Sequence, residues 1–183
     1  MSSSAGRLNT AERESILAEL AALERLCLPT AWSIKQINAA LQISRAAVLY
    51  TIDSISDAIF DLRLDSDDHM VARPCDMPLA PTQFDRLTSG LDAYLIYQPG
   101  TDFYEILRLG VHPAVRRQGR AHSLLHALLR LTSQRILLEV SSENAAALAL
   151  YSRSGFTEIH RRQQYYGPHD EAVIMEHPGR GPA

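Results

Sequence analysis

A glycine that joins a predicted strand to a predicted helix is the first candidate for chemistry. It is Gly119, within residues 111–121, and small Ala121 follows two positions later. The first turn of a helix leaves backbone N–H groups without intrahelical partners, and the helix dipole adds positive potential there. Main chain alone can therefore hold a pyrophosphate, with mobile positive charge from Arg116, Arg117 and Arg120 around it. A lone glycine more often marks an ordinary strand-to-helix turn with a solvated basic face.

Two side chains further along the chain could transfer protons. Glu139 is the only acid in the apolar residues 136–140, and strand alternation puts it on the face of Leu137, away from Ile136 and Leu138. Such a carboxylate can act as a general base through a water. The alternative is an acid at a strand end that forms a salt bridge. Tyr151 lies on the next predicted helix, and a phenol can donate a proton at neutral pH.

Two blocks of the sequence resemble a known family. Arg116-x-x-Gly119-x-Ala121 resembles the (Gln/Arg)-x-x-Gly-x-(Gly/Ala) acetyl-coenzyme A loop of the GNAT acyltransferases, and it lies between the expected strand and helix. A second block is similar to the other diagnostic segment of that superfamily; it comprises Leu138-Glu139-Val140, Asn144 through Tyr151, and Gly155-Phe156. The resemblance implies a GNAT fold and an acyltransferase activity.

Further residues resemble one branch of this superfamily, the bacterial ribosomal-protein alanine N-acetyltransferases. They are Glu139-Val140, Asn144, Leu150-Tyr151, Gly155-Phe156 and Tyr165-Tyr166. Upstream, Glu24-x-x-Cys27 and Ala31-Trp32-Ser33-x-Lys35 resemble the first-helix region of that branch. The resemblance covers residues 10–50 and 91–176. It implies acetyl transfer to the N-terminal α-amine of a protein, most directly a ribosomal protein with an N-terminal alanine.

The resemblance also implies which residues bind the substrates. Acetyl-coenzyme A would be the co-substrate, with no metal, and its expected contacts are Leu109, Val111, Arg116, Arg117, Gln118, Gly119, Arg120, Ala121, Asn144 and Tyr151. Tyr151 takes the position of the general acid, although its ring could instead pack on the pantetheine arm. Asn144 is explained equally well as a helix cap. The peptide would be bound by Trp32, Glu139, Tyr165 and Tyr166.

The chemistry of the acceptor is consistent with one modest base. An α-amine with a pKa of about 7.7–8.0 is roughly 10–20% neutral at pH 7, whereas a lysine amine is neutral only to roughly 0.04%. Choosing an α-amine therefore saves on the order of 3 kcal/mol of deprotonation. Main-chain N–H groups around Val111 would polarise the acetyl carbonyl.

Several alternatives stay open at this point. Glu105, on the preceding strand, is a rival base. Tyr165 and Tyr166 could serve as one core ring and one exposed ring instead of a peptide groove. The acceptor could be a small-molecule amine, and a non-catalytic module that binds coenzyme A is a further reading.

These residues must be positioned by a mixed α/β fold. Apolar spacing predicts helices from residue 10 to about residue 27, over 34–41, from 120 onward and from 144 to 151. Strands are predicted over 46–52, 93–97, 103–111 and 136–140, followed by a hairpin of 156–162 and 172–176 that residues 165–171 connect. In the strand 103–111, Glu105, Leu107, Leu109 and Val111 should share one face. The expected fold class is α/β (α+β), a GNAT acyltransferase fold with a mixed, mostly antiparallel sheet, flanking helices and a splayed strand pair that binds acetyl-CoA.

A single domain is expected over residues 10–176, with flexible tails at 1–9 and 177–183. Residues 53–90 carry eight aspartates and three prolines, which predicts an acidic insertion between two paired strands. These aspartates could steer a basic protein tail toward the site.

Composition narrows the class of partner. With 18 Lys and Arg against 21 Asp and Glu, the chain has no global basic field, so direct nucleic-acid binding is not expected. Two cysteines without CxxC spacing indicate neither a disulfide framework nor a zinc site. Neither a signal segment nor a membrane span is apparent. We expect a cytoplasmic protein that is a monomer or weak dimer.

Overall fold

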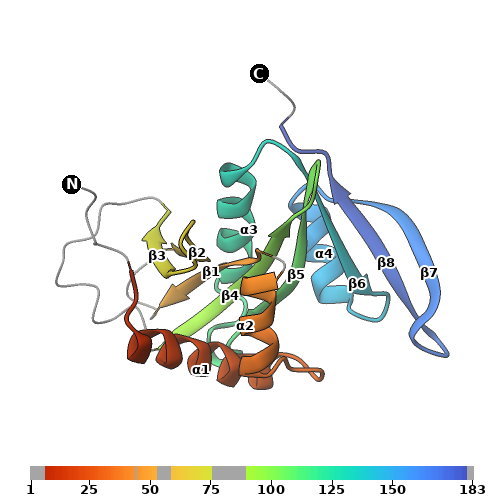
Figure 1. Ribbon diagram of the computed structural model, residues 1–183. Coiled ribbons are helices and arrows are strands. Elements are labelled where there is room, and N and C mark those ends of the chain that lie inside the picture. The colour runs from red at the N-terminus through yellow and green to blue at the C-terminus, as the bar shows by residue number, and fades with distance from the viewer. Residues whose placement is uncertain (1–6, 44, 53–58, 76–89, 181–183) are drawn as a thin grey trace.

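The computed structural model describes residues 7–43, 45–52, 59–75 and 90–180. The helices in this part of the chain are α1 (Thr10–Cys27), α2 (Ile34–Ile43), α3 (Arg120–Leu131) and α4 (Ala145–Arg153), with a short 3₁₀ turn at Pro113–Val115. The strands are β1 (Ala47–Ile52), β2 (Ile59–Leu64), β3 (Met70–Pro74), β4 (Leu91–Pro99), β5 (Phe103–Val111), β6 (Arg135–Ser141), β7 (Thr157–Gly167) and β8 (Asp170–His177). They form one sheet in the order β3-β2-β1-β4-β5-β6-β8-β7 (Figure 1). The predicted mixed, mostly antiparallel sheet with flanking helices is confirmed.

The helices cover opposite faces of the sheet, and each face has its own hydrophobic core. On what we call the α1–α2 face, the fully buried Ile16 and Ile37 pack with side chains of β1 and β4. On the α3–α4 face, Leu124 and Tyr151 pack with side chains of β4, β5, β6 and β8. Burial of these apolar side chains, at about 25 cal/mol per Å², holds both helix layers on the sheet.

The start of each N-terminal helix is fixed by a capping box. Before α2, the Gln36 backbone N–H donates to Ser33 Oγ and the Ser33 N–H donates to Gln36 Oε1, as predicted. Before α1, Asn9 and Glu12 make the same reciprocal pair, which the prediction of a flexible tail missed. These caps set where the α1–α2 connection, residues 28–33, begins and ends.

Both predicted tails are held where the structure describes them. The Leu8 N–H donates to the Met70 carbonyl at 2.9 Å, and Arg7 bridges to Val71 of β3. At the other end, the Arg180 guanidinium donates to the carbonyl oxygen of Arg130 at 2.7 Å. Parts of the two expected tails, residues 7–9 and 177–180, thus contact the rest of the chain, while residues 1–6 and 181–183 lie outside the described residues.

The predicted acidic insertion contains two strands of the sheet. Its flanking strands pair as predicted, with Val48 of β1 opposite Ile96 of β4. However, β2 pairs with the other edge of β1 and β3 pairs with β2, so residues 59–74 extend the sheet. Leu62 of β2 is fully buried on the α1–α2 face. The density of aspartates masked this short apolar pattern, and residues 53–58 and 76–89 of the insertion lie outside the described residues.

The aspartates of the described insertion are compensated locally. The ion pairs are Asp61–Arg63, Asp65–Arg7, Asp67–Arg7 and Asp68–Arg45. Paired charges produce little field at a distance, so these four do not support the expected steering of a basic tail. The remaining aspartates, Asp53, Asp57, Asp76 and Asp85, lie outside the described residues.

A β-bulge in β5 overturns the predicted alternation of that strand. Tyr97 of β4 lies opposite Ile106, but Ile96 lies opposite Arg108, so Leu107 is one extra residue in β5. Leu107 packs on the α1–α2 face, while Leu109 and Val111 pack on the α3–α4 face. One inserted residue moves every later side chain to the other face, which a sequence period of two cannot anticipate.

The pairing of β5 with β6 is short. The two parallel strands pair from Phe103 opposite Arg135 to Ile106 opposite Leu138, and no pairing between them follows in the described residues. Leu107 to Val111 and Glu139 to Ser141 therefore continue as two diverging strands, which we call the β5–β6 split. The bulge coincides with the start of the split. The predicted splayed strand pair is confirmed.

The terminal hairpin is longer than predicted. β7 continues to Gly167 and β8 begins at Asp170, so only two residues connect them and the predicted connection 165–171 is wrong. Arg162 lies opposite Ala172 and Gly167 opposite Asp170, which leaves extra residues in β7 between the two pairs. Tyr165 and Tyr166 lie in this bulged stretch.

A buried carboxylate ties α1 to the middle of the sheet. Glu24 is fully buried and accepts hydrogen bonds from Tyr94 Oη at 2.6 Å and from the Trp32 backbone N–H at 2.9 Å. The Arg108 guanidinium lies 4.0 Å from it. Burial, followed by the contact with Glu24, raises the pKa of Tyr94, so its phenol stays protonated and keeps donating. Glu24 thereby fixes the α1–α2 connection against β4 and β5.

Gly110 faces Tyr94 across β4 and β5, and a Cβ there would overlap the Tyr94 ring. That ring cannot withdraw without losing its bond to Glu24. We therefore expect Gly110→Ala to lower the free energy of unfolding by about 1–3 kcal/mol, measured by urea denaturation. Gly167→Ala is the matched control, because a Cβ there meets nothing within 4 Å. Equal stability of the two variants would contradict this packing.

Glu24→Gln keeps the shape of the side chain but offers one acceptor oxygen to two donors. One of the donors, Tyr94 Oη or the Trp32 N–H, then lacks a partner in a buried site, which costs about 1–3 kcal/mol of stability. Glu14→Gln on the exposed side of the same helix is the control and should change little. An unchanged urea midpoint for Glu24→Gln would show that the buried network contributes nothing.

Candidate active site

The candidate site residues lie on both faces of the sheet, and the β5–β6 split connects the faces. Tyr151 belongs to the core of the α3–α4 face. Glu139 alternates with the buried Leu138 and Val140 of that core, so its side chain lies on the α1–α2 face as predicted. Glu139 is also the first residue of β6 beyond its pairing with β5. Groups on the two faces can therefore approach each other at this point of the sheet.

The loop before α3 has the geometry of an anion cradle. Gly119 has a φ of 83°, in the left-handed region, and no side chain caps the helix that starts after it. A Cβ at Gly119 would meet nothing within 4 Å, so the space beside this residue is open. The Arg116 Nε donates to the Val111 carbonyl at 3.2 Å, which closes the loop onto the end of β5. These features fit the pyrophosphate of acetyl-CoA, as predicted from the motif.

The arginines of the cradle differ from one another. Arg116 and Arg117 are exposed, but Arg120 is largely buried, with its guanidinium 3.9 Å from Asp92 of β4. The expectation that Arg120 supplies mobile positive charge is wrong, because the first turn of α3 points this side chain toward the sheet. Arg116 and Arg117 carry the accessible charge, while Gln118 is exposed between them and the glycine.

The other expected cofactor contacts lie on β5, in the first turn of α3 and just before α4. Leu109 and Val111 are partly buried on the α3–α4 face of β5. Ala121 is half-buried in the first turn of α3. Asn144 precedes α4 and accepts a hydrogen bond from the Ala147 N–H at 3.1 Å, so its capping role is confirmed.

Glu139 forms an ion pair with an arginine of β7. Its Oε1 lies 2.9 Å from Arg162 Nη1 of β7, and a quarter of the Glu139 side chain is exposed. The Arg162 guanidinium also lies 5.5 Å from the centre of the Tyr165 ring. The salt bridge considered for Glu139 therefore exists, and it sits within the candidate site. Two adjacent arginines, Arg161 and Arg162, are visible in the sequence. Only the bulged register of β7 shows that Arg162 is the one that faces Glu139.

The two adjacent tyrosines of β7 meet at the same place. Tyr165 and Tyr166 stack edge to face with ring centres 4.9 Å apart, and both are about half exposed. Neither is a core ring, so the alternative of one buried and one exposed tyrosine is wrong. Partial burial, followed by the nearby Glu139 carboxylate, raises the pKa of Tyr166. Burial raises the pKa of Tyr151 as well, and Tyr166 adds to the effect.

The opposite wall of the site comes from the α1–α2 connection. Trp32 lies there, and the Arg108 guanidinium stacks over its ring at 4.6 Å. Arg108 also donates to the Thr30 carbonyl at 2.9 Å. Its charge partly offsets the burial and the carboxylates that raise the pKa of Tyr166. Arg108 thus links Trp32 to the tyrosines. Only the bulge at Leu107 turns it to this face, so sequence alternation could not find it.

Glu105 is less suited to the role of base. It lies on β5 before the split, opposite Gln98 of β4 and Leu137 of β6. Gln98 Nε2 donates to its carboxylate at 2.8 Å. A carboxylate in the paired part of the sheet has no opening toward the α3–α4 face, which favours Glu139.

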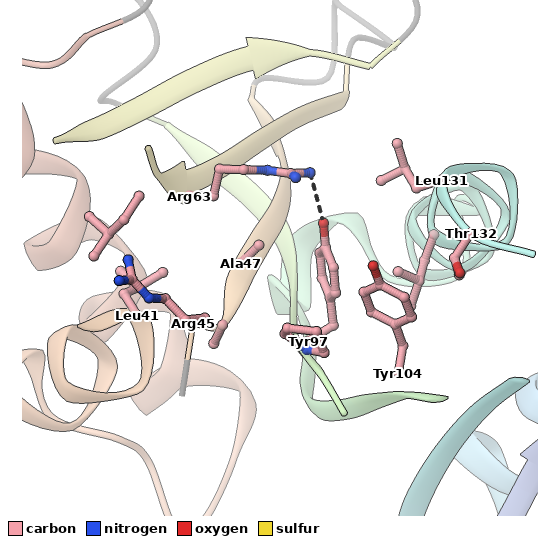
Figure 2. A pocket seen from close by; sticks show the side chains of 12 residues that line it. Leu41, Arg45, Ala47, Arg63, Tyr97, Tyr104, Leu131 and Thr132 are labelled. Atoms are coloured by element: carbon pink, nitrogen blue, oxygen red, sulfur yellow. Dashed lines mark hydrogen bonds between the residues drawn. The ribbon is translucent and has the colours of Figure 1, made fainter. Parts of the chain in front are cut away.

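A cavity of about 370 Å³ lies elsewhere on the molecule. It is lined by the side chains shown in Figure 2, including Arg63, Tyr97 and Tyr104, at the hairpin end of β4 and β5. None of the candidate site residues lines it. The cradle lies at the other end of β5, so we do not place the chemistry in this cavity.

In the described residues, no helix has the length and apolarity required to cross a membrane.

Comparison with known proteins identifies the family. The chain matches the Acetyltransferase (GNAT) family over residues 62–156. It is 29% identical over 158 residues to the ribosomal protein bS18 alanine N-acetyltransferase of Salmonella typhimurium, covering 82% of this chain and 90% of that relative. The corresponding Escherichia coli K12 enzyme is 37% identical over 93 residues, covering 47% of this chain and 63% of that relative.

Solved structures share the fold. The crystal structure of the Escherichia coli ribosomal-protein-S18-alanine N-acetyltransferase superposes with a TM-score of 0.60 at 23% identity, over 97% of this chain and 94% of that one. A chain of the NatC complex bound to Gag peptide and CoA gives 0.61 at 19% identity, over 94% and 95%. The family match spans half of the chain, and the sheet is arranged as in these enzymes. The chain therefore belongs to the GNAT family of acetyltransferases and is an N-acetyltransferase.

Proposed function

We propose that this enzyme transfers acetyl from acetyl-CoA to the N-terminal α-amine of a protein, with a ribosomal protein that begins with alanine as the substrate. The observation that carries the proposal is Glu139 at the opening of the β5–β6 split, near Tyr166 and on the sheet face where Arg108 stacks over Trp32. The relatives that act on ribosomal protein bS18 support the choice of substrate.

The two substrates would approach from opposite faces. The pyrophosphate of acetyl-CoA lies on the N–H groups at the start of α3, and its arm follows Leu109 and Val111 toward the split. The peptide enters on the α1–α2 face between Trp32 and the tyrosine pair, whose half-exposed phenols can hydrogen-bond a peptide backbone. The thioester carbonyl and the amine then meet where β5 and β6 diverge.

Glu139 and Tyr151 account for the two protons that move in the reaction. Glu139 accepts the proton that the amine loses as its nitrogen attacks the acetyl carbon, directly or through a water. Main-chain N–H groups of the unpaired edge of β5 stabilise the carbonyl oxygen as it gains charge. The carbon–sulfur bond then breaks, and Tyr151 gives its proton to the departing thiolate. Since burial raises the pKa of Tyr151, that phenol is protonated throughout the working pH range.

A peptide panel tests the proposed acceptor. Acetyl-CoA turnover is measured with peptides that differ in their first three residues, beside N-blocked peptides, peptides with lysine as the only amine, and small amines. We expect turnover with free α-amines, highest with an N-terminal alanine, and little with the blocked or lysine-only peptides. Turnover of small amines alone would replace the proposed acceptor with a metabolite.

Glu139→Gln removes the base while keeping the volume of the side chain. We expect kcat/KM for the peptide to fall by roughly 10²–10⁴-fold. Affinity for acetyl-CoA, measured by calorimetry, should stay close to wild type because the cradle lies on the other face. Glu105→Gln is the matched control on the neighbouring strand. If Glu105→Gln abolished turnover and Glu139→Gln did not, the base would be Glu105.

Tyr151→Phe distinguishes a proton donor from a packing ring. The variant keeps the ring against Phe156, whose centre lies 5.8 Å away, but loses the hydroxyl. We expect kcat to fall by roughly 10²-fold with unchanged affinity for coenzyme A. Tyr104→Phe, at the far end of β5, should be neutral. An unchanged kcat in Tyr151→Phe would leave the ring with a packing role only.

A further inference from the structure

The Glu139–Arg162 ion pair spans an intervening strand. β8 lies between β6 and β7, and Arg162 is placed directly across Ala172, which is itself opposite Ser141. Side chains opposite one another share a face, so Ser141, Ala172 and Arg162 lie on the α1–α2 face with Glu139. Ala172 is fully buried and small, and the Arg162 side chain passes over it to reach the carboxylate.

Its neighbour Arg161 is held differently. Arg161 pairs with Glu158 at 2.7 Å and with Glu171 at 3.1 Å, away from the candidate base. The two arginines have similar exposure, 44% and 50% of the side chain. Of these two arginines, only Arg162 is paired with Glu139, and Arg161 is a natural control.

The other charged and titratable groups around Glu139 come from four elements. β5 contributes Arg108, whose charge faces the buried Glu24, and β8 begins with Asp170, which accepts from Ser141 Oγ at 2.6 Å. Tyr166 of β7 and Tyr151 of α4 are neutral phenols. β7 also carries the exposed His160, which lies opposite Ile174, the residue of β8 that is opposite Glu139. Without Arg162, the carboxylate of Glu139 would dominate the charge at the place where the amine must arrive.

A carboxylate without a nearby positive charge disfavours the neutral, nucleophilic form of an amine beside it. A negative charge within about 4–6 Å stabilises the ammonium form and raises its pKa, commonly by about 1–3 units. The acceptor amine would then bind tightly as an ammonium, which has no lone pair to attack the thioester. A guanidinium beside the carboxylate cancels this effect while leaving the second carboxylate oxygen available to a proton.

We propose that Arg162 is a positioning residue that neutralises Glu139 and so keeps the bound acceptor in its neutral amine form. The proposal rests on the proposed function of the site. When Glu139 takes the proton and becomes neutral, Arg162 loses its ion-pair partner. The Tyr165 ring, 5.5 Å away, then offers the guanidinium a cation–π contact on the same strand.

The test is the pH dependence of Arg162→Gln, Arg162→Lys and Arg161→Gln. The kcat profile reports the pKa of the bound amine, whereas kcat/KM reports free enzyme and free substrate. We expect Arg162→Gln to move the acidic limb of the kcat profile up by about one pH unit, with little movement of the kcat/KM limb. Arg162→Lys keeps the charge and should restore the limb, and Arg161→Gln should match wild type. An unmoved kcat limb in Arg162→Gln would overturn the proposal, even if the rate fell.

A binding measurement gives a second readout that needs no turnover. An alanine-initiated peptide is titrated into the enzyme saturated with coenzyme A, at pH 6 and at pH 9. We expect Arg162→Gln to bind the peptide roughly 10-fold more tightly than wild type at pH 6, where it is an ammonium, and equally at pH 9. Weaker binding by Arg162→Gln at both pH values would contradict the proposal.

Failure of the proposed function can be distinguished from failure of the role proposed for Arg162. If wild type acetylated small amines and no peptide, the acceptor would be revised. The same two titrations with the accepted amine would still decide the role of Arg162.

Discussion

The candidate chemistry depends on β5 and β6 ceasing to pair after four residues. Parallel strands normally continue their hydrogen-bond ladder for as long as both run on, so an early end requires a local cause. That cause is the bulge at Leu107, which inserts one residue into β5 at the position where its partner is lost. Unpaired backbone groups in the middle of a sheet are costly unless side chains, water or another molecule pair with them. The split is therefore an opening in the sheet where a ligand can pair with the backbone.

The bulge also decides which side chains meet at the opening. It turns Arg108 toward Trp32 on the α1–α2 face and leaves Leu109 and Val111 on the α3–α4 face. The fully buried Glu24 then holds Tyr94 and the α1–α2 connection against these strands. A buried carboxylate is expensive to desolvate and is retained only with good partners. Here its partners fix the wall that faces Glu139, so stability and site geometry depend on the same contacts.

Local sequence signals predicted the elements and one side of the site well. Periodicity located the four helices of the described residues, the capping box at Ser33 and Gln36 gave the start of α2, and Asn144 gave the start of α4. Alternation placed Glu139 on the correct face because β6 has no bulge. The predictions failed where a bulge inserts extra residues into a strand, and where a charged side chain is paired with a residue distant in the sequence. The bulges of β5 and β7 reversed or extended the expected strands, and Asp92, distant in sequence, buried Arg120. β2 and β3 were missed because aspartates surround their short apolar pattern, and Arg7, which pairs with Asp65 and Asp67 between the two strands, is distant in the sequence.

The most direct test of this account is a crystal structure with coenzyme A joined covalently to an alanine-initiated peptide. The account predicts that the pantetheine passes between Leu107–Val111 and Glu139–Ser141, with the pyrophosphate at Gly119 on the α3–α4 face. The peptide should lie on the α1–α2 face, between Trp32 and the Tyr165–Tyr166 pair. A conjugate bound wholly on one face, with β5 and β6 closed over their full length, would contradict it.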